Sequence, residues 1–391
     1  MCANKLFRNP IIAEQAKFEE AQFIPDPYLG HRLPEGNDFI GEHAYISLTE
    51  IIKEIQNNPT KKIVLNLGDS STSGWDSNVV TENRKRLANG RKLKPAFFQY
   101  KTYSDYLRNY LKDKFIVINA GVPAYTSLQG KRRLELIINS FKENRIRVDY
   151  LTIYFGNNDS VWDTNREDKE WINSSRGTRK KIKNNKNEQQ NIVTRVSPID
   201  YGINLQEIID MCHTENIIPI TIEPQVPIHW KPGTRVKKEE LPRRSGRGST
   251  FVYDLLDEAL DLWRIAIKEK TNKQLKIKTL EYLKEKDYIV PRIKKDHLRK
   301  LYETINNTDI DFISLKLNRF KDDIRYFIDY CHPIKYANIL IAKEIKKVIL
   351  KHEILKKSTP LKTNEKPELK LKKTKLSDMP MQIPTNHYTL Y

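Results

Sequence analysis

A short polar turn directly behind an apolar run is the first place in this sequence that could do chemistry. The run Ile63–Leu67 is followed by Gly68, Asp69 and Ser70. An apolar run of this length that ends in a Gly-Asp-Ser turn is typical of a buried strand that stops abruptly. Ser70 would then lie at the carboxyl end of a strand and at the start of a helix, where backbone amides stabilise negative charge. A nucleophilic serine would be useful at this position.

Two later apolar runs end in polar turns of the same kind. The run Phe115–Ile118 is followed closely by Gly121, and the run Tyr150–Phe155 is followed closely by Asn158. If these strands are parallel, their carboxyl ends meet at one edge of a sheet and the turns converge there. The amide of Gly121 and the side chain of Asn158 would then supply hydrogen-bond donors for an oxyanion beside the nucleophile.

A nucleophilic serine needs a base, and His332 has the best setting among the eight histidines of the chain. It lies three residues after Asp329, just before the last helical stretch. A carboxylate at that spacing could hold the imidazole and favour the tautomer that a general base requires. A lone histidine is more often a surface or capping residue, so this interpretation depends on the three turns as well.

Strand and helix patterns alternate along the chain and define the elements that must position these residues. Amphipathic helices are predicted between the strands because apolar residues recur three and four positions apart. The predicted strands cover Ile63–Leu67, Phe115–Ile118, Tyr150–Phe155, Ile217–Ile222 and Leu275–Leu280. The predicted helices cover Ser47–Gln56, Tyr103–Leu111, Leu134–Phe141, Leu205–Cys212, Phe251–Lys270 and Lys335–Lys351. This alternation predicts an α/β fold of three layers, α/β/α, with a mostly parallel five-stranded sheet.

One main domain over residues 61–351 is expected to contain the sheet. An N-terminal extension over 1–60 is expected to pack on this core. Stretches rich in polar and charged residues predict insertions in the domain near 165–195, 229–249 and 282–325. The lysine-rich end over 352–391 is expected to be a basic, disordered tail.

The chain is strongly basic, with a net charge of +19 and a pI near 9.5. Such a balance can indicate nucleic acid or an anionic surface as a partner. Here the excess charge is concentrated in the insertions and the tail, and aromatic residues are not interleaved with it as stacking on bases would require. The charge pattern therefore favours a solvated lysine-rich surface, and no specific nucleic-acid partner is predicted.

The remaining composition excludes several other classes. Three distant cysteines imply no disulfide framework, and the chain has neither a Cys-x-x-Cys pair nor a glycine-rich phosphate loop. No metal site and no cofactor are therefore expected. No stretch approaches the roughly 18 consecutive apolar residues of a membrane helix, and residues 1–10 contain no apolar core of a signal peptide. A cytoplasmic location is expected.

Taken together, the four turns resemble the sequence blocks of the SGNH hydrolases, the GDSL-like esterases and lipases. Their order and approximate spacing fit, and the resemblance covers about 60–165, 196–228 and 325–350. One residue departs from the family pattern, because Ala124 stands where a glycine is common. The matching blocks are Gly68-Asp69-Ser70, Gly121 within Asn119-Ala-Gly, Gly156-Asn-Asn158-Asp159, and Asp329-x-x-His332.

The resemblance implies a flavodoxin-like hydrolase fold and a role for each matching residue. Ser70 attacks the carbonyl carbon of an ester, and His332 takes the serine proton and later protonates the leaving alcohol. Asp329 orients His332 and stabilises its charged form. The amides of Ser70 and Gly121 and the side chain of Asn158 hold the tetrahedral oxyanion. Water then releases the acyl group, so the implied function is that of a serine esterase.

Two other functions stay open at this point. An O-acyltransferase would use the same serine chemistry, with a carbohydrate or another alcohol in place of water. A non-catalytic basic binding protein could use the fold only as a scaffold, because fold does not fix function. The expected substrate is a small-molecule or carbohydrate acyl ester, whereas the acyl group, the alcohol part and the oligomeric state are not determined by the sequence.

Overall fold

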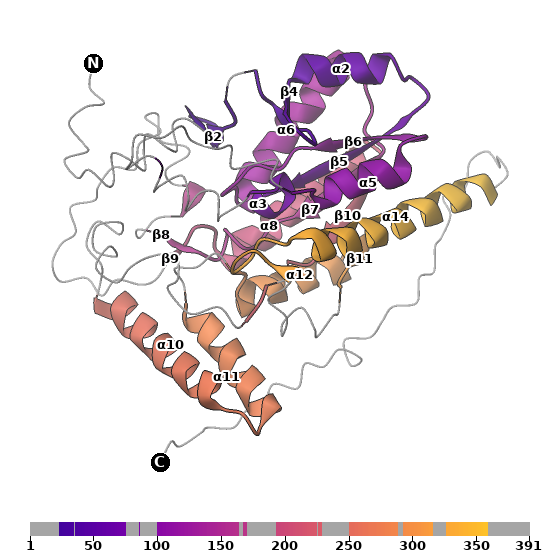
Figure 1. Ribbon diagram of the computed structural model, residues 1–391. Helices are drawn as coiled ribbons and strands as arrows, with labels where there is room; N and C mark the ends of the chain where they lie inside the picture. The colour runs from indigo at the N-terminus through magenta and orange to yellow at the C-terminus, as the bar shows by residue number, and fades with distance from the viewer. Residues whose placement is uncertain are drawn as a thin grey trace, which may run out of the picture. The chain divides into compact units, whose positions relative to one another are not determined.

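The structure is a computed structural model of the chain (Figure 1). It describes residues 23–34, 36–75, 86, 100–163, 167–169, 193–224, 226–228, 250–287, 292–315 and 326–358. The chain divides into two units, Met1–Ile349 and Leu350–Tyr391. In the second unit the described residues are 350–358, the last part of helix α14 (Lys335–Ser358). The sheet and the candidate site both lie in the first unit.

A mixed sheet of seven strands forms the centre of the first unit (Figure 1). Its order is β11-β10-β7-β5-β6-β3-β4, in which the first five strands are parallel and the last two are antiparallel. Their bounds are β3 Phe39–Ile40, β4 Tyr45–Ile46, β5 Lys62–Gly68, β6 Phe115–Asn119, β7 Tyr150–Tyr154, β10 Ile218–Ile222 and β11 Asp311–Ile313.

The five parallel strands have the flavodoxin-like order 2-1-3-4-5 when they are numbered along the chain. The predicted fold class is confirmed, and β3 and β4 from the N-terminal region enlarge the sheet. In this topology the strand order reverses between β5 and β7, and ligands bind outside the carboxyl ends of the strands at that point. Ser70 follows β5 and Asn158 follows β7, so both lie at the carboxyl edge of the sheet beside this switch point.

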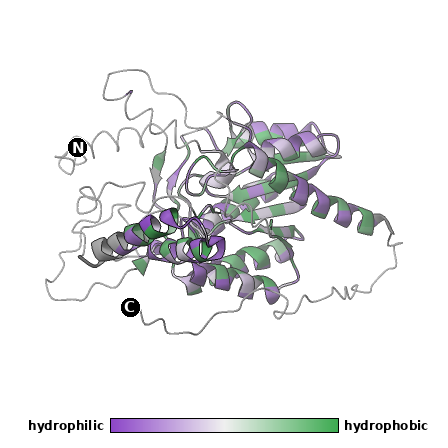
Figure 2. Cartoon of the chain, turned by 60° about the horizontal axis from the view of Figure 1, so that its bottom comes forward, coloured by the Kyte–Doolittle hydropathy of each residue, from purple (hydrophilic) through white to green (hydrophobic). Residues whose placement is uncertain are grey.

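Helices cover both faces of the sheet. Along β5 the side chains alternate between the faces: Ile63, Leu65 and Leu67 join one buried cluster, and Val64 joins the other. The first cluster also contains apolar residues of α2 (Leu48–Gln56), α6 (Ser127–Glu143), α8 (Pro198–Thr214) and α12 (Lys295–Asn306). The second contains residues of α5 (Tyr103–Leu111) and α14. Because both faces of the sheet are buried, its strands are nearly continuous apolar runs. Figure 2 colours the sheet and the helices around it by the hydropathy of each residue.

The predicted fifth strand is wrong. Leu275–Leu280 lies within helix α11 (Lys273–Lys286), which is capped by Asn272. The local alternation of apolar and lysine residues resembles a strand, but the buried residues Leu280 and Leu283 are three apart, as on a helix. The fifth parallel strand is instead β11, which lies inside the range 282–325 that was expected to be an insertion.

Other predicted elements fall close to the observed ones, and shorter elements complete the fold. The N-terminal region contributes α2, β3 and β4, and its Phe39 and Ile51 belong to a buried cluster of the core. The remaining elements are β1 (Ile24–Asp26), β2 (Gly30–Arg32), α3 (Ser70–Ser73), β8 (Trp162–Asp163), β9 (Val193–Thr194) and α10 (Thr250–Lys268).

Three sequence predictions concern residues that are mostly outside the described ranges. These are the insertion near 165–195, apart from 167–169 and 193–195, the whole insertion at 229–249, and the tail beyond residue 358. The tail prediction is corrected at its start, since α14 continues to Ser358. Among the described helices, none has the length and apolar character needed to span a membrane.

Candidate active site

A tight strand-to-helix turn places Ser70. Gly68 ends β5, and a Cβ there would meet the Thr72 Oγ1 atom at 2.0 Å and the Tyr154 carbonyl oxygen at 2.9 Å, so only glycine fits. Asp69 caps the short helix α3 by accepting a hydrogen bond from the Ser71 amide at 2.8 Å. Ser70 is the first residue of this helix and is 7% exposed.

A second tight turn, far along the sequence, brings a histidine to this serine. The Ile328 amide donates to the His332 carbonyl oxygen at 3.0 Å and closes the turn. Within it, one oxygen of Asp329, Oδ1, accepts from the amides of Cys331 and His332, each at 2.9 Å. The other oxygen, Oδ2, lies 2.6 Å from His332 Nδ1. The opposite ring nitrogen, Nε2, lies 2.7 Å from the Ser70 hydroxyl oxygen.

The structure therefore brings together the three residues that the sequence singled out as nucleophile, base and orienting acid. The carboxylate, imidazole and hydroxyl form one continuous hydrogen-bonded chain, and Asp329, His332 and Ser70 are all buried. A carboxylate on Nδ1 favours the tautomer with its proton on Nδ1, which leaves Nε2 free to accept the hydroxyl proton of Ser70. This is the geometry expected of an activated serine.

One group of described residues offers three ligand atoms close enough for a metal ion: Asp329, Cys331 and His332, with atoms within 4.8 Å of one another. Two oxygen or nitrogen ligands of a tetrahedral zinc ion lie about 3.3 Å apart, given metal–ligand bonds of about 2.0–2.1 Å. The 2.6 Å between His332 Nδ1 and Asp329 Oδ2 is shorter than that and suits a shared proton. These residues therefore fit a hydrogen-bonded pair better than a metal site.

The three predicted oxyanion donors lie at the adjoining turns, and two of them already have acceptors. The Gly121 amide donates to Asn119 Oδ1 at 3.0 Å. The Asn158 side-chain amide donates to Asp69 Oδ2 and to the Tyr125 carbonyl oxygen, each at 3.1 Å. None of the described residues accepts a hydrogen bond from the Ser70 amide. An oxyanion would bind this amide and share the donors of the other two residues.

No residue with a side chain fits at the position of Gly121. A Cβ at this position would lie 2.5 Å from the Ser73 amide nitrogen and 2.8 Å from the Thr72 Cβ atom. The turn after β6 thus packs directly against helix α3, which begins with the nucleophile. Asn119 reinforces the contact, because its side-chain amide donates to the Thr72 carbonyl oxygen at 2.8 Å.

Two buried aspartates support the turns. Burial raises the pKa of the Asp69 carboxyl to about 6, although hydrogen bonds from Ser71 and Asn158 and the nearby His332 favour its charged form. Burial likewise raises the pKa of Asp159 to about 7 against two hydrogen bonds from Ser127, whose hydroxyl lies 2.6 Å from Asp159 Oδ1. Asp69 thus accepts hydrogen bonds from α3 and from Asn158, and Asp159 accepts them from the start of α6, so both carboxylates support the turns of the site.

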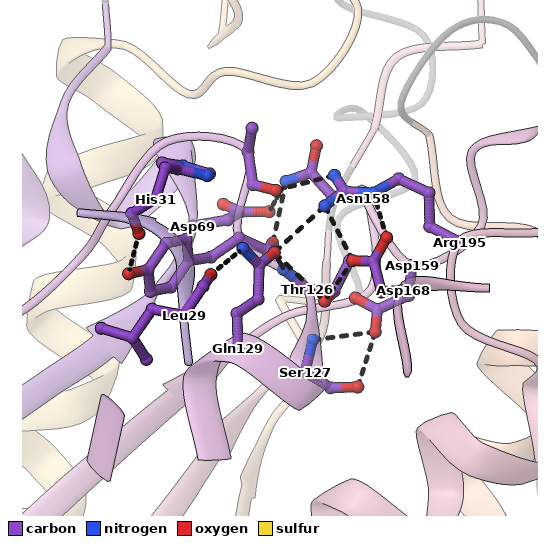
Figure 3. A network of polar contacts seen from close by, with 12 residues as sticks. Leu29, His31, Asp69, Thr126, Ser127, Gln129, Asn158, Asp159, Asp168 and Arg195 are labelled. Atoms are coloured by element: carbon purple, nitrogen blue, oxygen red, sulfur yellow. Dashed lines mark hydrogen bonds and ion pairs between the residues drawn. The ribbon is translucent and has the colours of Figure 1, made fainter. Parts of the chain in front are cut away.

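A buried ion pair beside the site was not predicted from the sequence. Asp168 and Arg195 lie within the range expected as a polar insertion, yet their side chains are 0% and 11% exposed and are joined by two short contacts (Figure 3). They connect to Thr126 and Gln129 at the start of α6. No local pattern marks a pair 27 residues apart, so no signal in this single sequence could have revealed it.

Comparison with known proteins bears on this arrangement. Residues 67–257 match the model of the GDSL-like Lipase/Acylhydrolase family. This match confirms the resemblance drawn from the sequence blocks over that segment. The match ends before Asp329 and His332, so the roles of these two residues rest on the geometry. No curated protein is similar enough to count as a relative.

Several solved structures are distantly similar to the chain. An aryl esterase from M. smegmatis is 13% identical, with 73% of this chain and 99% of that chain covered and a TM-score of 0.37. An acetylxylan esterase from Geobacillus stearothermophilus is 14% identical, with 74% of this chain and 94% of that chain covered and a TM-score of 0.34. An esterase from Pseudoalteromonas sp. is 14% identical, with 75% of this chain and 100% of that chain covered and a TM-score of 0.35. At these scores the similarities carry no argument about substrate.

Proposed function

We propose that the chain is a serine esterase acting through an acyl-enzyme on Ser70, from the premise that residues 67–257 match the model of the GDSL-like Lipase/Acylhydrolase family. The observation that carries this proposal is the hydrogen-bonded chain from Ser70 Oγ through His332 to Asp329, with contacts of 2.7 and 2.6 Å. These residues come from opposite ends of the domain and meet at the carboxyl edge of the sheet.

In the first half of the reaction, Ser70 Oγ attacks the carbonyl carbon of the ester as His332 Nε2 accepts its proton. The Asp329 carboxylate stabilises the imidazolium that forms. The negative charge on the tetrahedral oxygen is held by the Ser70 and Gly121 amides and by the Asn158 side chain, each worth about 10²–10³ in rate. His332 then gives the proton to the departing alcohol, which leaves the acyl group on Ser70.

In the second half, water attacks the acyl-enzyme with His332 again as the base. The free carboxylic acid is released and Ser70 regains its proton. We assign water as the acceptor because the family is one of acylhydrolases. The substrate class proposed is a small-molecule or carbohydrate acyl ester, and a carbohydrate hydroxyl in place of water would make the same site an acyltransferase.

The direct test is Ser70→Ala with a short-chain aryl acetate as substrate. Loss of the nucleophile is expected to lower kcat by at least about 10⁴-fold. Ser71→Ala is the matched control: it removes the neighbouring hydroxyl of α3, whose oxygen lies at a weak 3.5 Å from the Cys331 carbonyl oxygen, and keeps the Ser71 amide that caps on Asp69. It should retain activity within about fivefold. Turnover by Ser70→Ala at the wild-type rate would reject the mechanism. A separate product analysis with an added sugar distinguishes hydrolysis, which releases the free acid, from transfer, which yields the acylated sugar.

A further inference from the structure

The turn that supports the Asn158 amide contains a strained residue. Ala124 has a φ of 63°, in the left-handed region that an alanine rarely adopts because its Cβ approaches the following carbonyl oxygen. The next residue, Tyr125, is fully buried, and its carbonyl oxygen accepts one of the two hydrogen bonds from Asn158. Such a backbone conformation persists only where its surroundings hold it in place. The orientation of Asn158 therefore depends on whatever fixes this turn.

Arg195 fixes the turn directly. Its Nη1 atom donates to the Ala124 carbonyl oxygen at 2.7 Å. Its Nε and Nη2 atoms donate to the two carboxylate oxygens of Asp168 at 3.1 and 2.8 Å, and Nη2 also donates to Gln129 Oε1 at 3.0 Å. A planar guanidinium can hold a carboxylate with one edge and a carbonyl with another, which a lysine ammonium cannot do in the same geometry.

The partners of Arg195 are themselves anchored around the same turn (Figure 3). Asp168 Oδ2 accepts from the hydroxyl of Thr126, two residues after the strained Ala124, at 3.0 Å. Gln129 accepts from the Thr126 amide and donates to the Leu29 carbonyl oxygen at 2.6 Å. Asp168 and Gln129 thus fix the position of the guanidinium, which in turn donates to the Ala124 carbonyl oxygen.

The backbone of Arg195 reaches the neighbouring turn as well. The Arg195 amide donates to the Val161 carbonyl oxygen at 2.8 Å, and the Val196 amide donates to the Asp159 carbonyl oxygen at 3.1 Å. Asp159 directly follows Asn158. Arg195 therefore holds the turn after β6 through its side chain and the turn after β7 through its backbone. These are the two turns that carry the Gly121 and Asn158 donors.

We propose that Arg195, held by Asp168, is a positioning residue for the oxyanion hole: it fixes the Ala124 turn and through Tyr125 the amide of Asn158. The proposal rests on the proposed function, because it assigns Asn158 to the oxyanion. Its role is indirect, since the guanidinium contacts the turn and the ion pair rather than the reacting atoms. If the turn loosens, the Asn158 donor moves away from the position where negative charge develops, and the transition state is stabilised less.

The test compares Arg195→Lys and Arg195→Gln with the wild type on an aryl acetate. Active sites are first counted by stoichiometric reaction with a fluorophosphonate, and kcat is expressed per titrated site. A positioning role predicts that kcat per site falls at least threefold in Arg195→Lys and at least tenfold in Arg195→Gln, with KM changed less than threefold. A merely structural role lowers the number of competent sites and leaves kcat per site unchanged. Arg147→Gln, which alters a 69% exposed arginine paired with Asp149, is the matched control and should behave as the wild type.

A fall in kcat per site smaller than threefold in both variants would overturn the proposal. Arg195→Gln leaves the Asp168 carboxylate buried without its partner charge, so it can fail to fold. Arg195→Lys retains the positive charge but loses the planar guanidinium. If Arg195→Gln does not fold, the kcat per site of Arg195→Lys alone decides the question. The outcome is separable from the proposed function: an inactive Ser70→Ala together with unaffected Arg195 variants rejects only the positioning role.

Discussion

Replacing Asp329 by asparagine should prevent His332 from acting as the base without disturbing the fold. Asp329 Oδ1 accepts two backbone hydrogen bonds, from the amides of Cys331 and His332, and Oδ2 faces His332 Nδ1. The asparagine oxygen must keep the position that faces the two amides, because the reverse orientation would set its NH₂ group against two N–H donors. The NH₂ group then points at Nδ1 and forces the ring proton onto Nε2. Nε2 can no longer accept the proton of Ser70.

The size of the effect follows from that change of tautomer. The same loss in a serine–histidine–aspartate triad lowers kcat by about 10⁴-fold, equivalent to about 5 kcal/mol of transition-state stabilisation. Because the two backbone hydrogen bonds to Oδ1 are retained, the midpoint of thermal unfolding should change little. The substitution therefore separates the function of the carboxylate from its structural role in the turn.

The assay is hydrolysis of a short-chain aryl acetate, with circular dichroism to confirm the fold. Asp261→Asn is the control, since Asp261 is 67% exposed and pairs only with Arg264 one turn along α10 among the described residues. Its kcat should equal that of the wild type. A folded Asp329→Asn enzyme with kcat within tenfold of the wild-type value would refute the assignment of Asp329 as the residue that orients the base.

Two stability predictions follow from other parts of the fold. Arg145 is exposed and has a φ of 58° just after α6, so Arg145→Gly should raise the free energy of unfolding by about 0.5–1 kcal/mol in chemical denaturation. Asn216→Gly, at the equivalent position after α8, should raise it less because asparagine tolerates this backbone conformation. Equal effects of the two substitutions would contradict the reasoning. Burial lowers the pKa of His297 to about 4, so its contribution to stability is present above pH 6.5 and is lost as pH falls toward 4. Between pH 6.5 and 4, the free energy of unfolding of the wild type should therefore drop by roughly 3 kcal/mol more than that of His297→Gln. The exposed control His213→Gln should follow the wild type. The account would be refuted if the unfolding free energies of His297→Gln and the wild type changed equally with pH.

Much of the site could be predicted from the sequence because its parts are local. Each of the parallel strands β5, β6 and β7 ends in a turn whose small and polar residues can be recognised in the sequence, and Gly68 and Gly121 occupy positions where no side chain fits. The spacing of Asp329 and His332 likewise reflects one short turn. Parallel topology then brings these turns to one edge, which is a general property of such sheets.

The remaining features depend on contacts between distant segments. Strand β11 has three residues, begins with the charged Asp311 and lies at the sheet edge, so it carries almost no periodic signal. The apolar spacing around Leu280 reveals a helix only when several turns are considered together. Arg195 looks like one more basic residue beside a polar stretch, and only the folded chain shows the carboxylate and carbonyl that it binds.

The central claim is that the Ser70 hydroxyl is activated by His332, and labelling with a fluorophosphonate probe tests it most directly, without knowledge of the substrate. After peptide mapping, the tag should lie on the peptide that contains Ser70, be absent from Ser70→Ala, and form far more slowly in His332→Gln. Folded wild-type protein that takes up no tag, or that carries it on a different peptide, would contradict the claim.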